Sequence, residues 1–67
     1  MEWLAIKHYE YDLIFVQSRE GRDIVLNYYV ENGITINTVV LRVFNSEEEA
    51  TKYCNNINQI TNLIKNL

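Results

Sequence analysis

The sequence has no proline, and it has only two glycines, one cysteine and one histidine. A single cysteine cannot form a disulfide within the chain, and one cysteine with one histidine cannot supply the four ligands of a structural zinc site. Small domains often depend on such links, because a chain of this size buries only about 60% of its unfolded surface. We therefore expect packing and self-association to stabilise this domain.

Long apolar runs and an excess of positive charge are missing as well. No apolar stretch approaches the roughly 20 residues that span a bilayer, and Glu2 stands where a secretory signal carries basic residues. Nine acidic and six basic residues leave a net charge of −3, which gives no electrostatic footprint for binding phosphates. These absences predict a cytoplasmic protein without a membrane partner, and they disfavour nucleic acid as a partner.

Apolar residues make up 48% of the chain, which is too many for an intrinsically disordered protein. No linker, repeat or low-complexity segment interrupts the sequence, so residues 1–67 are predicted to form one small domain. Asparagine and isoleucine are frequent, which is typical of AT-rich coding sequence. This composition favours a low-GC bacterium, one of its phages or a mobile element as the source.

The last third of the sequence predicts an amphipathic helix. Ser46 followed three residues later by Glu49 is a capping box, and the acidic run 47–49 suits the positive end of a helix dipole. Cys54, beside the apolar stripe, is expected to be a small buried hydrophobe. The stripe is too short for a coiled coil with a second copy, so we expect it to pack on a sheet. It consists of Ala50, Tyr53, Ile57, Ile60, Ile64 and Leu67.

Everything before this helix is predicted to be strand. Runs rich in β-branched and aromatic residues lie at 13–17, 23–30 and 34–44. Turns are expected at Gly21 and at Asn32-Gly33, and Asn-Gly is the strongest short hairpin signal.

The N-terminal segment 3–9 has two interpretations. It either continues into the first strand as one bent unit, which we favour, or forms a separate strand that breaks near residues 9–12. The predicted fold is α+β: a three-stranded antiparallel meander, four-stranded if this segment is separate, with one C-terminal helix packed on one face (β-β-β-α).

The register of the Asn32-Gly33 hairpin also has two solutions. A two-residue loop pairs Glu31 with Ile34, whereas a three-residue loop with a bulge at Gly33 pairs Val30 with Ile34. We prefer the second, because it separates apolar from polar side chains more cleanly. In either register one helix, roughly 30 Å long and 10 Å wide, covers only one face of the sheet. The other face stays apolar, and such patches usually mark a partner surface.

Aromatic and apolar residues on this uncovered face are the predicted partner-binding site. Tyr28 and Tyr29 are adjacent in a predicted strand, so one of them must lie outside the helix-covered core. Tyrosine is enriched at interaction hot spots, although ordinary β-propensity also explains tyrosines on a sheet. The predicted site comprises Tyr9, Tyr11, Tyr29, Val39 and Leu41.

The sequence contains no motif that combines the residues of a catalytic or metal-binding site. His8, Glu10 and Asp12 alternate, so a strand would place all three on one face, where they could bind a divalent metal or exchange protons. The same pattern describes a solvated strand face, and no second cluster completes a site. We therefore predict no catalytic residue, no metal and no cofactor.

These observations predict a small non-enzymatic protein-interaction module. It would bind a protein partner, or a second copy as a homodimer, through the exposed aromatic sheet face or an edge strand. An accessory protein of a phage or mobile element that inhibits a host factor fits the size, acidity and composition. The alternative is a small dimeric nucleic-acid-binding regulator that stacks bases on its aromatic residues.

Overall fold

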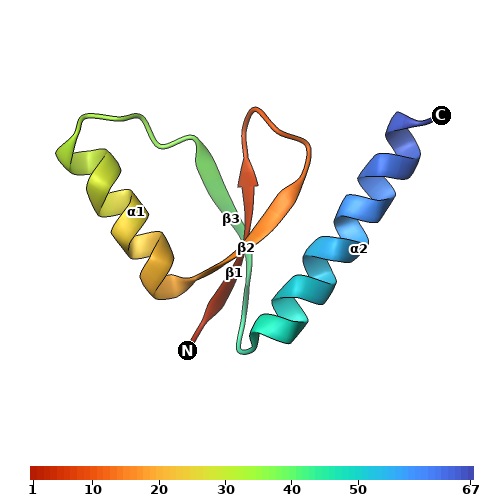
Figure 1. Cartoon of the computed structure of the whole chain (residues 1–67), viewed down its shortest axis with the longest axis horizontal. Coiled ribbons are helices and arrows are strands. Elements are labelled where there is room, and N and C mark those ends of the chain that lie inside the picture. The colour runs from red at the N-terminus through yellow and green to blue at the C-terminus, as the bar shows by residue number, and fades with distance from the viewer.

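The computed structural model describes residues 1–67 and contains three strands and two helices (Figure 1). The predicted α+β class, with three antiparallel strands in one sheet and a C-terminal helix, is confirmed. The assignment of the middle of the chain is wrong, because one predicted strand is a helix. The elements in chain order are β1 (Trp3–His8), β2 (Ile14–Ser18), α1 (Arg19–Glu31), β3 (Thr38–Phe44) and α2 (Glu47–Lys65).

The sheet has the order β2-β1-β3, so the N-terminal strand is its centre. Both neighbours pair with β1 in antiparallel fashion. On the β3 side Ala5 pairs with Arg42 and Ile6 with Val40, which leaves Leu41 as the extra residue of a β-bulge. Because β1 is central, β2 and β3 each have an outer edge with no neighbouring strand.

The two helices lie on opposite faces of the sheet, which Figure 1 shows nearly edge-on between them. On the α2 face, Ala5, Ile14 and Cys54 form a buried cluster. Successive residues of a strand point to opposite faces, so Leu4 and Ile6 point toward α1, and both are fully buried. The sheet therefore has apolar packing on both faces. The expectation of one wholly uncovered face is wrong, because α1 lies on it.

The run 23–30, predicted as a strand, lies within α1 because both ends of that helix are capped. Ser18 is the N-cap, and its hydroxyl accepts a hydrogen bond from the Gly21 N–H at 3.1 Å. At the other end the Ile34 N–H donates to the Tyr29 carbonyl, and the Gly33 N–H donates to the Val30 carbonyl. This is a Schellman motif with Gly33 in the left-handed conformation at φ +66°.

The turn predicted at Gly21 and both predicted hairpin registers are therefore wrong, whereas the turn predicted at Asn32-Gly33 is present and ends a helix. Gly21 lies inside the first turn of α1. The Asn32-Gly33 pair ends a helix, because a glycine with positive φ serves a helix C-terminus as well as a two-residue hairpin. The hairpin of the structure instead joins β1 to β2 through residues 9–13. The segment 3–9 is thus a separate strand, and the favoured single bent strand is wrong.

The predicted cap of α2 is present, but its apolar stripe is only partly covered. Ser46 is the N-cap and accepts from the Glu49 N–H at 3.1 Å. Ala50 and Cys54 are buried against the sheet, as expected for the first half of the helix. The second half extends past the sheet, so Ile60 and Ile64 are exposed, and the predicted packing of the whole stripe on the sheet is wrong there.

The domain is less compact than a typical protein of the same number of residues. Its radius of gyration is 13.1 Å, whereas a compact chain of 67 residues has about 11 Å. Its accessible surface is 4963 Å², and a compact protein of 8.0 kDa exposes about 4,450 Å². Figure 1 shows the reason, since the helices begin near the same end of the sheet and diverge toward the other.

Candidate protein-interaction surface

The structure distributes the five predicted partner-binding residues over three elements. Tyr9 and Tyr11 are exposed in the turn between β1 and β2, and Tyr29 is half-buried on α1. Val39 and Leu41 are exposed on β3. Tyr9 lies beside the start of β3, because its N–H donates to the Asn37 carbonyl at 2.9 Å. These residues do not form one aromatic sheet face.

The outer edge of β2 is occupied at Ile14 by one side chain of α2. The Ile14 N–H donates to Asn58 Oδ1 at 2.9 Å, and Asn58 Nδ2 donates back to the Ile14 carbonyl at 2.9 Å. This amide bonds to both backbone groups of Ile14 as a neighbouring strand would. Exposed sheet edges invite pairing with other chains, and covering them prevents it. Asn58 therefore occupies the β2 edge at Ile14.

The outer edge of β3 has no such cover. The Asn37 carbonyl accepts from the Tyr9 N–H, so the backbone of Asn37 faces β1. Along an antiparallel strand, the backbone groups of successive residues alternate between bonding to the neighbouring strand and facing away from it. The backbone groups of Thr38 and Val40 therefore face outward. The Thr38 carbonyl accepts from Arg22 Nη2 at 3.4 Å, so the open stretch begins at Val40.

The same alternation holds beyond the bulge. The Arg19 N–H donates to the Glu2 carbonyl at 3.0 Å, so Glu2 and then Leu4 bond toward β2. Val43 pairs with Leu4 on the other side of β1, and its backbone groups consequently face the open edge. The β3 residues whose backbone groups face the open edge without a partner are thus Val40 and Val43.

Exposed apolar side chains follow this open edge. Val39 is 38% exposed, Leu41 46% and Val43 42%. β3 has seven residues, no proline and one charged residue, Arg42. Long, apolar edge strands are sites of pairing with another chain, and of the devices that protect such edges β3 has the bulge at Leu41 and the charge of Arg42. We call residues 39–43 the β3 edge.

Opposite charges lie at the two ends of β3. At its start, Arg22 Nη1 donates to Thr38 Oγ1, and the Arg22 side chain is buried. Lys7 stands opposite Val39 on β1. Just after its end come the three glutamates of the first turn of α2, residues 47–49. Arg22 takes part in neither ion pair of the molecule, which are Arg19–Glu2 and Lys65–Asp12.

The second half of α2 carries another exposed apolar area. Leu63 is 69% exposed, and Ile60 and Ile64 stand on the same side of the helix. Lys65 Nζ lies 2.6 Å from Asp12 Oδ2 and ties this half of the helix to the β1–β2 turn. The hydrogen bond from Lys65, together with its charge, holds the pKa of the Asp12 carboxyl below its usual value.

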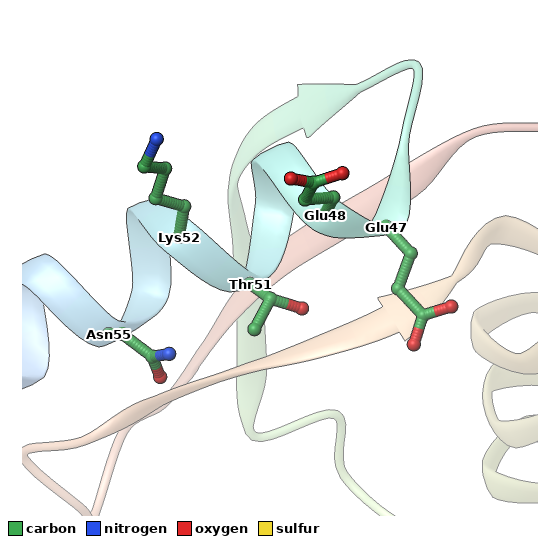
Figure 2. Close-up of a pocket in the computed structure, with 5 residues that line it drawn as sticks. All are labelled: Glu47, Glu48, Thr51, Lys52 and Asn55. Carbon is green, nitrogen blue, oxygen red and sulfur yellow. The ribbon is translucent and has the colours of Figure 1, made fainter.

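Two hollows open on the surface of the domain. One, of about 550 Å³, is lined only by α2 side chains, and Figure 2 shows them spread along the outer surface of that single helix. The other, of about 580 Å³, lies between the β1–β2 turn and α2 and is lined by Leu13, Ile14 and Phe15 with polar neighbours. Asn58 and Lys65 line it too, but both already hold partners within the domain.

The alternating His8, Glu10 and Asp12 do not share a strand face. β1 ends at His8, and the other two residues lie in the turn. His8 Nδ1 accepts from the Glu10 N–H at 3.1 Å, and Asp12 pairs with Lys65. No group of three His, Cys, Asp or Glu side chains is close enough to hold a metal ion. Cys54 is buried as predicted, and burial raises the pKa of its thiol.

Comparison of the chain with protein-family models, curated proteins and solved structures gives no match. Neither helix combines the length and the apolar character that crossing a bilayer requires.

Sequence reasoning missed two residues of the candidate surface. Val43 continues the β3 edge beyond Leu41, and the run 34–44 contained it without singling it out. Asn58 is the residue that distinguishes the two edges of the sheet. No local pattern identifies it, since its partner Ile14 lies 44 positions away.

Proposed function

We propose that the protein is a small non-enzymatic interaction module that binds a protein, either another chain or a copy of itself, through the β3 edge. The observation that carries this proposal is the row of exposed apolar side chains along one edge strand. Val39, Leu41 and Val43 are exposed on β3, whose outer edge has no neighbouring strand, whereas Asn58 occupies the β2 edge at Ile14. Strand addition to an exposed edge is a common mode of protein recognition.

The open form of the domain also supports binding. Only seven of the 67 residues are buried, and Leu41 and Val43 stay exposed although the chain is rich in apolar residues. Burying apolar surface contributes roughly 25 cal/mol per Å², so covering this edge would favour association. The role of a phage or mobile-element accessory protein that inhibits a host factor stays a prediction from composition.

Nucleic-acid binding has one observation in its favour, because the exposed Arg42 guanidinium carbon lies 5.3 Å from the Phe44 ring centroid and 5.7 Å from the Tyr53 ring centroid. Against it, Arg19 and Lys65 are in ion pairs and Arg22 is buried. Aromatic stacking of bases needs exposed cations beside the rings. The two readings differ in their response to salt, because phosphate binding weakens steeply as salt rises and apolar strand pairing does not.

The experiment is capture on immobilised protein, with three baits: the wild type, Leu41→Lys on the β3 edge and Leu63→Lys on α2 as a matched control. The samples are purified untagged protein and a nuclease-treated lysate, washed at low and high salt. We expect a bound protein that Leu41→Lys loses and Leu63→Lys retains at both salt concentrations. Equal retention by all three baits, or binding that high salt abolishes, would contradict the proposal.

A further inference from the structure

We propose that Asn32 is a site of spontaneous deamidation, and that the C-terminal cap of α1 holds the reaction back while the cap is closed. Asn32 is exposed and is followed by Gly33. The backbone nitrogen after an asparagine can attack the side-chain amide carbon, and glycine, which has no side chain, hinders this attack least. A Cβ placed on Gly33 would have no atom within 4 Å, so the pair is open to solvent. This inference goes beyond the proposed function and does not depend on it.

The reaction consumes only water and transfers no electrons. The Gly33 nitrogen loses its proton and bonds to Asn32 Cγ, the bond from Cγ to Nδ2 breaks, and ammonia leaves with that proton. The product is a cyclic succinimide. Water then opens the ring at either carbonyl, which gives aspartate at position 32 or isoaspartate, in which the chain continues through the side-chain carbon.

The closed cap holds the reacting atoms apart. Ring closure requires the Gly33 nitrogen to be nearly eclipsed with Asn32 Cβ about the Cα–C bond. In the structure Asn32 has ψ 7°, so the Gly33 nitrogen is nearly eclipsed with the Asn32 backbone nitrogen and is turned away from Cβ. The Gly33 N–H donates to the Val30 carbonyl at 3.3 Å, and the Ile34 N–H donates to the Tyr29 carbonyl at 2.8 Å. The rotation breaks these bonds, so the reaction proceeds when this end of α1 frays, which costs little free energy.

The reaction weakens the same cap. Asn32 Nδ2 donates to the Tyr28 carbonyl at 2.8 Å, and a carboxylate in its place has no proton to donate. The new negative charge lies at the negative end of the helix dipole beside Glu31, and the last turn of α1 has no basic residue. Deamidation therefore leaves α1 less stable at its C-terminal end.

The other helix supplies a matched control within the chain. Asn66 is the C-cap of α2 with φ −92° and ψ 3°, and Asn32 is the C-cap of α1 with φ −103° and ψ 7°. Both asparagines are exposed. The residue after Asn66 is Leu67, whose side chain hinders attack by the backbone nitrogen. The difference between the two rates therefore measures the effect of Gly33.

The first experiment incubates the purified full chain at neutral pH, in native buffer and in guanidinium chloride. Mass spectrometry follows the conversion, and fragment ions locate it in the sequence. We expect Asn32 to convert at least about tenfold faster than Asn66 in the denaturant, where neither cap exists. We also expect Asn32 to convert at least about tenfold more slowly in native buffer than in the denaturant, because the cap must open first.

The second experiment uses Asn32→Asp, which carries the aspartate product from the start. Its melting temperature should be at least about 2 °C lower than that of the wild type, and its Ile34 N–H should exchange faster. The matched control Asn66→Asp adds the same charge at the end of α2, where Lys65 in the last turn offsets it. The melting temperature of this control should change less.

Three results would overturn this inference. Conversion at Asn32 that is absent or no faster than at Asn66 in the denaturant shows that the pair is not a reactive site. Equal rates at Asn32 in native buffer and in the denaturant show that the cap does not hold the reaction back. An Asn32→Asp protein as stable as the wild type shows that the product leaves the helix intact. None of these results bears on capture by the β3 edge, so the proposed function fails or succeeds separately.

Discussion

Replacing Leu4 with alanine should lower the free energy of unfolding by about 2–5 kcal/mol, which is the cost of truncating a fully buried leucine. Leu4 is 0% exposed and lies on the face of the sheet that α1 covers. A domain of this size has a total stability of roughly 3–10 kcal/mol, so the variant should lose a large part of its stability. Urea titration followed by circular dichroism and by the fluorescence of Trp3 measures the change.

The matched control is Leu63→Ala, which removes the same atoms from an exposed position on α2. Its effect should lie within about 0.5 kcal/mol of zero. A Leu4→Ala protein as stable as this control would contradict the layered structure. In that event α1 would not cover the sheet, and the second face would be bare.

Replacing Asn58 with alanine should have two effects. It leaves the Ile14 N–H and carbonyl without their partners, which costs about 1–3 kcal/mol for groups that are partly buried. It also removes the side chain that covers the β2 edge at Ile14, where another chain could then pair. We expect lower stability together with larger species in light scattering than the wild type forms.

Two further variants test whether these effects come from the lost hydrogen bonds to Ile14 or from any substitution of an amide residue in α2. Asn62→Ala alters an exposed amide on the same helix and should change neither stability nor association. Asn58→Asp can still accept from the Ile14 N–H but cannot donate to its carbonyl, so it should also be destabilised. An Asn58→Ala protein with wild-type stability and the same size distribution would show that the amide does not protect this edge.

The parts of the fold that sequence reasoning predicted correctly are those set by local chemistry. The Ser46 cap and the buried position of Cys54 follow from spacing along one helix. The residues of α1 are β-branched and aromatic, and such residues favour strands unless capping and packing decide otherwise. Ser18 and Gly33 decide this case, and the pattern Arg22, Val25, Leu26 and Tyr29 had helical spacing that could have indicated it.

The candidate surface was predictable only in part. The sequence predicts Val39 and Leu41 to be part of this surface, because the run 34–44 is apolar on both faces of the strand. One helix covers only one of these faces, so the apolar residues on the other face stay exposed. Tyr29 was assigned on a strand that does not exist, and its actual place is half-buried on α1. The cover of the β2 edge at Ile14 depends on the contact between Asn58 and Ile14. A pairing across the fold of this kind has no signature in a single sequence.

Amide hydrogen exchange along β3 tests the central claim most directly. The Val40 and Val43 N–H groups face the open edge, and the Val39 N–H faces β1 and serves as the internal control. We expect Val40 and Val43 to exchange rapidly in dilute protein and at least about tenfold more slowly in concentrated protein, with little change at Val39. Exchange at Val40 and Val43 that is fast at every concentration, in a protein that sediments as a dimer, would contradict pairing through this edge.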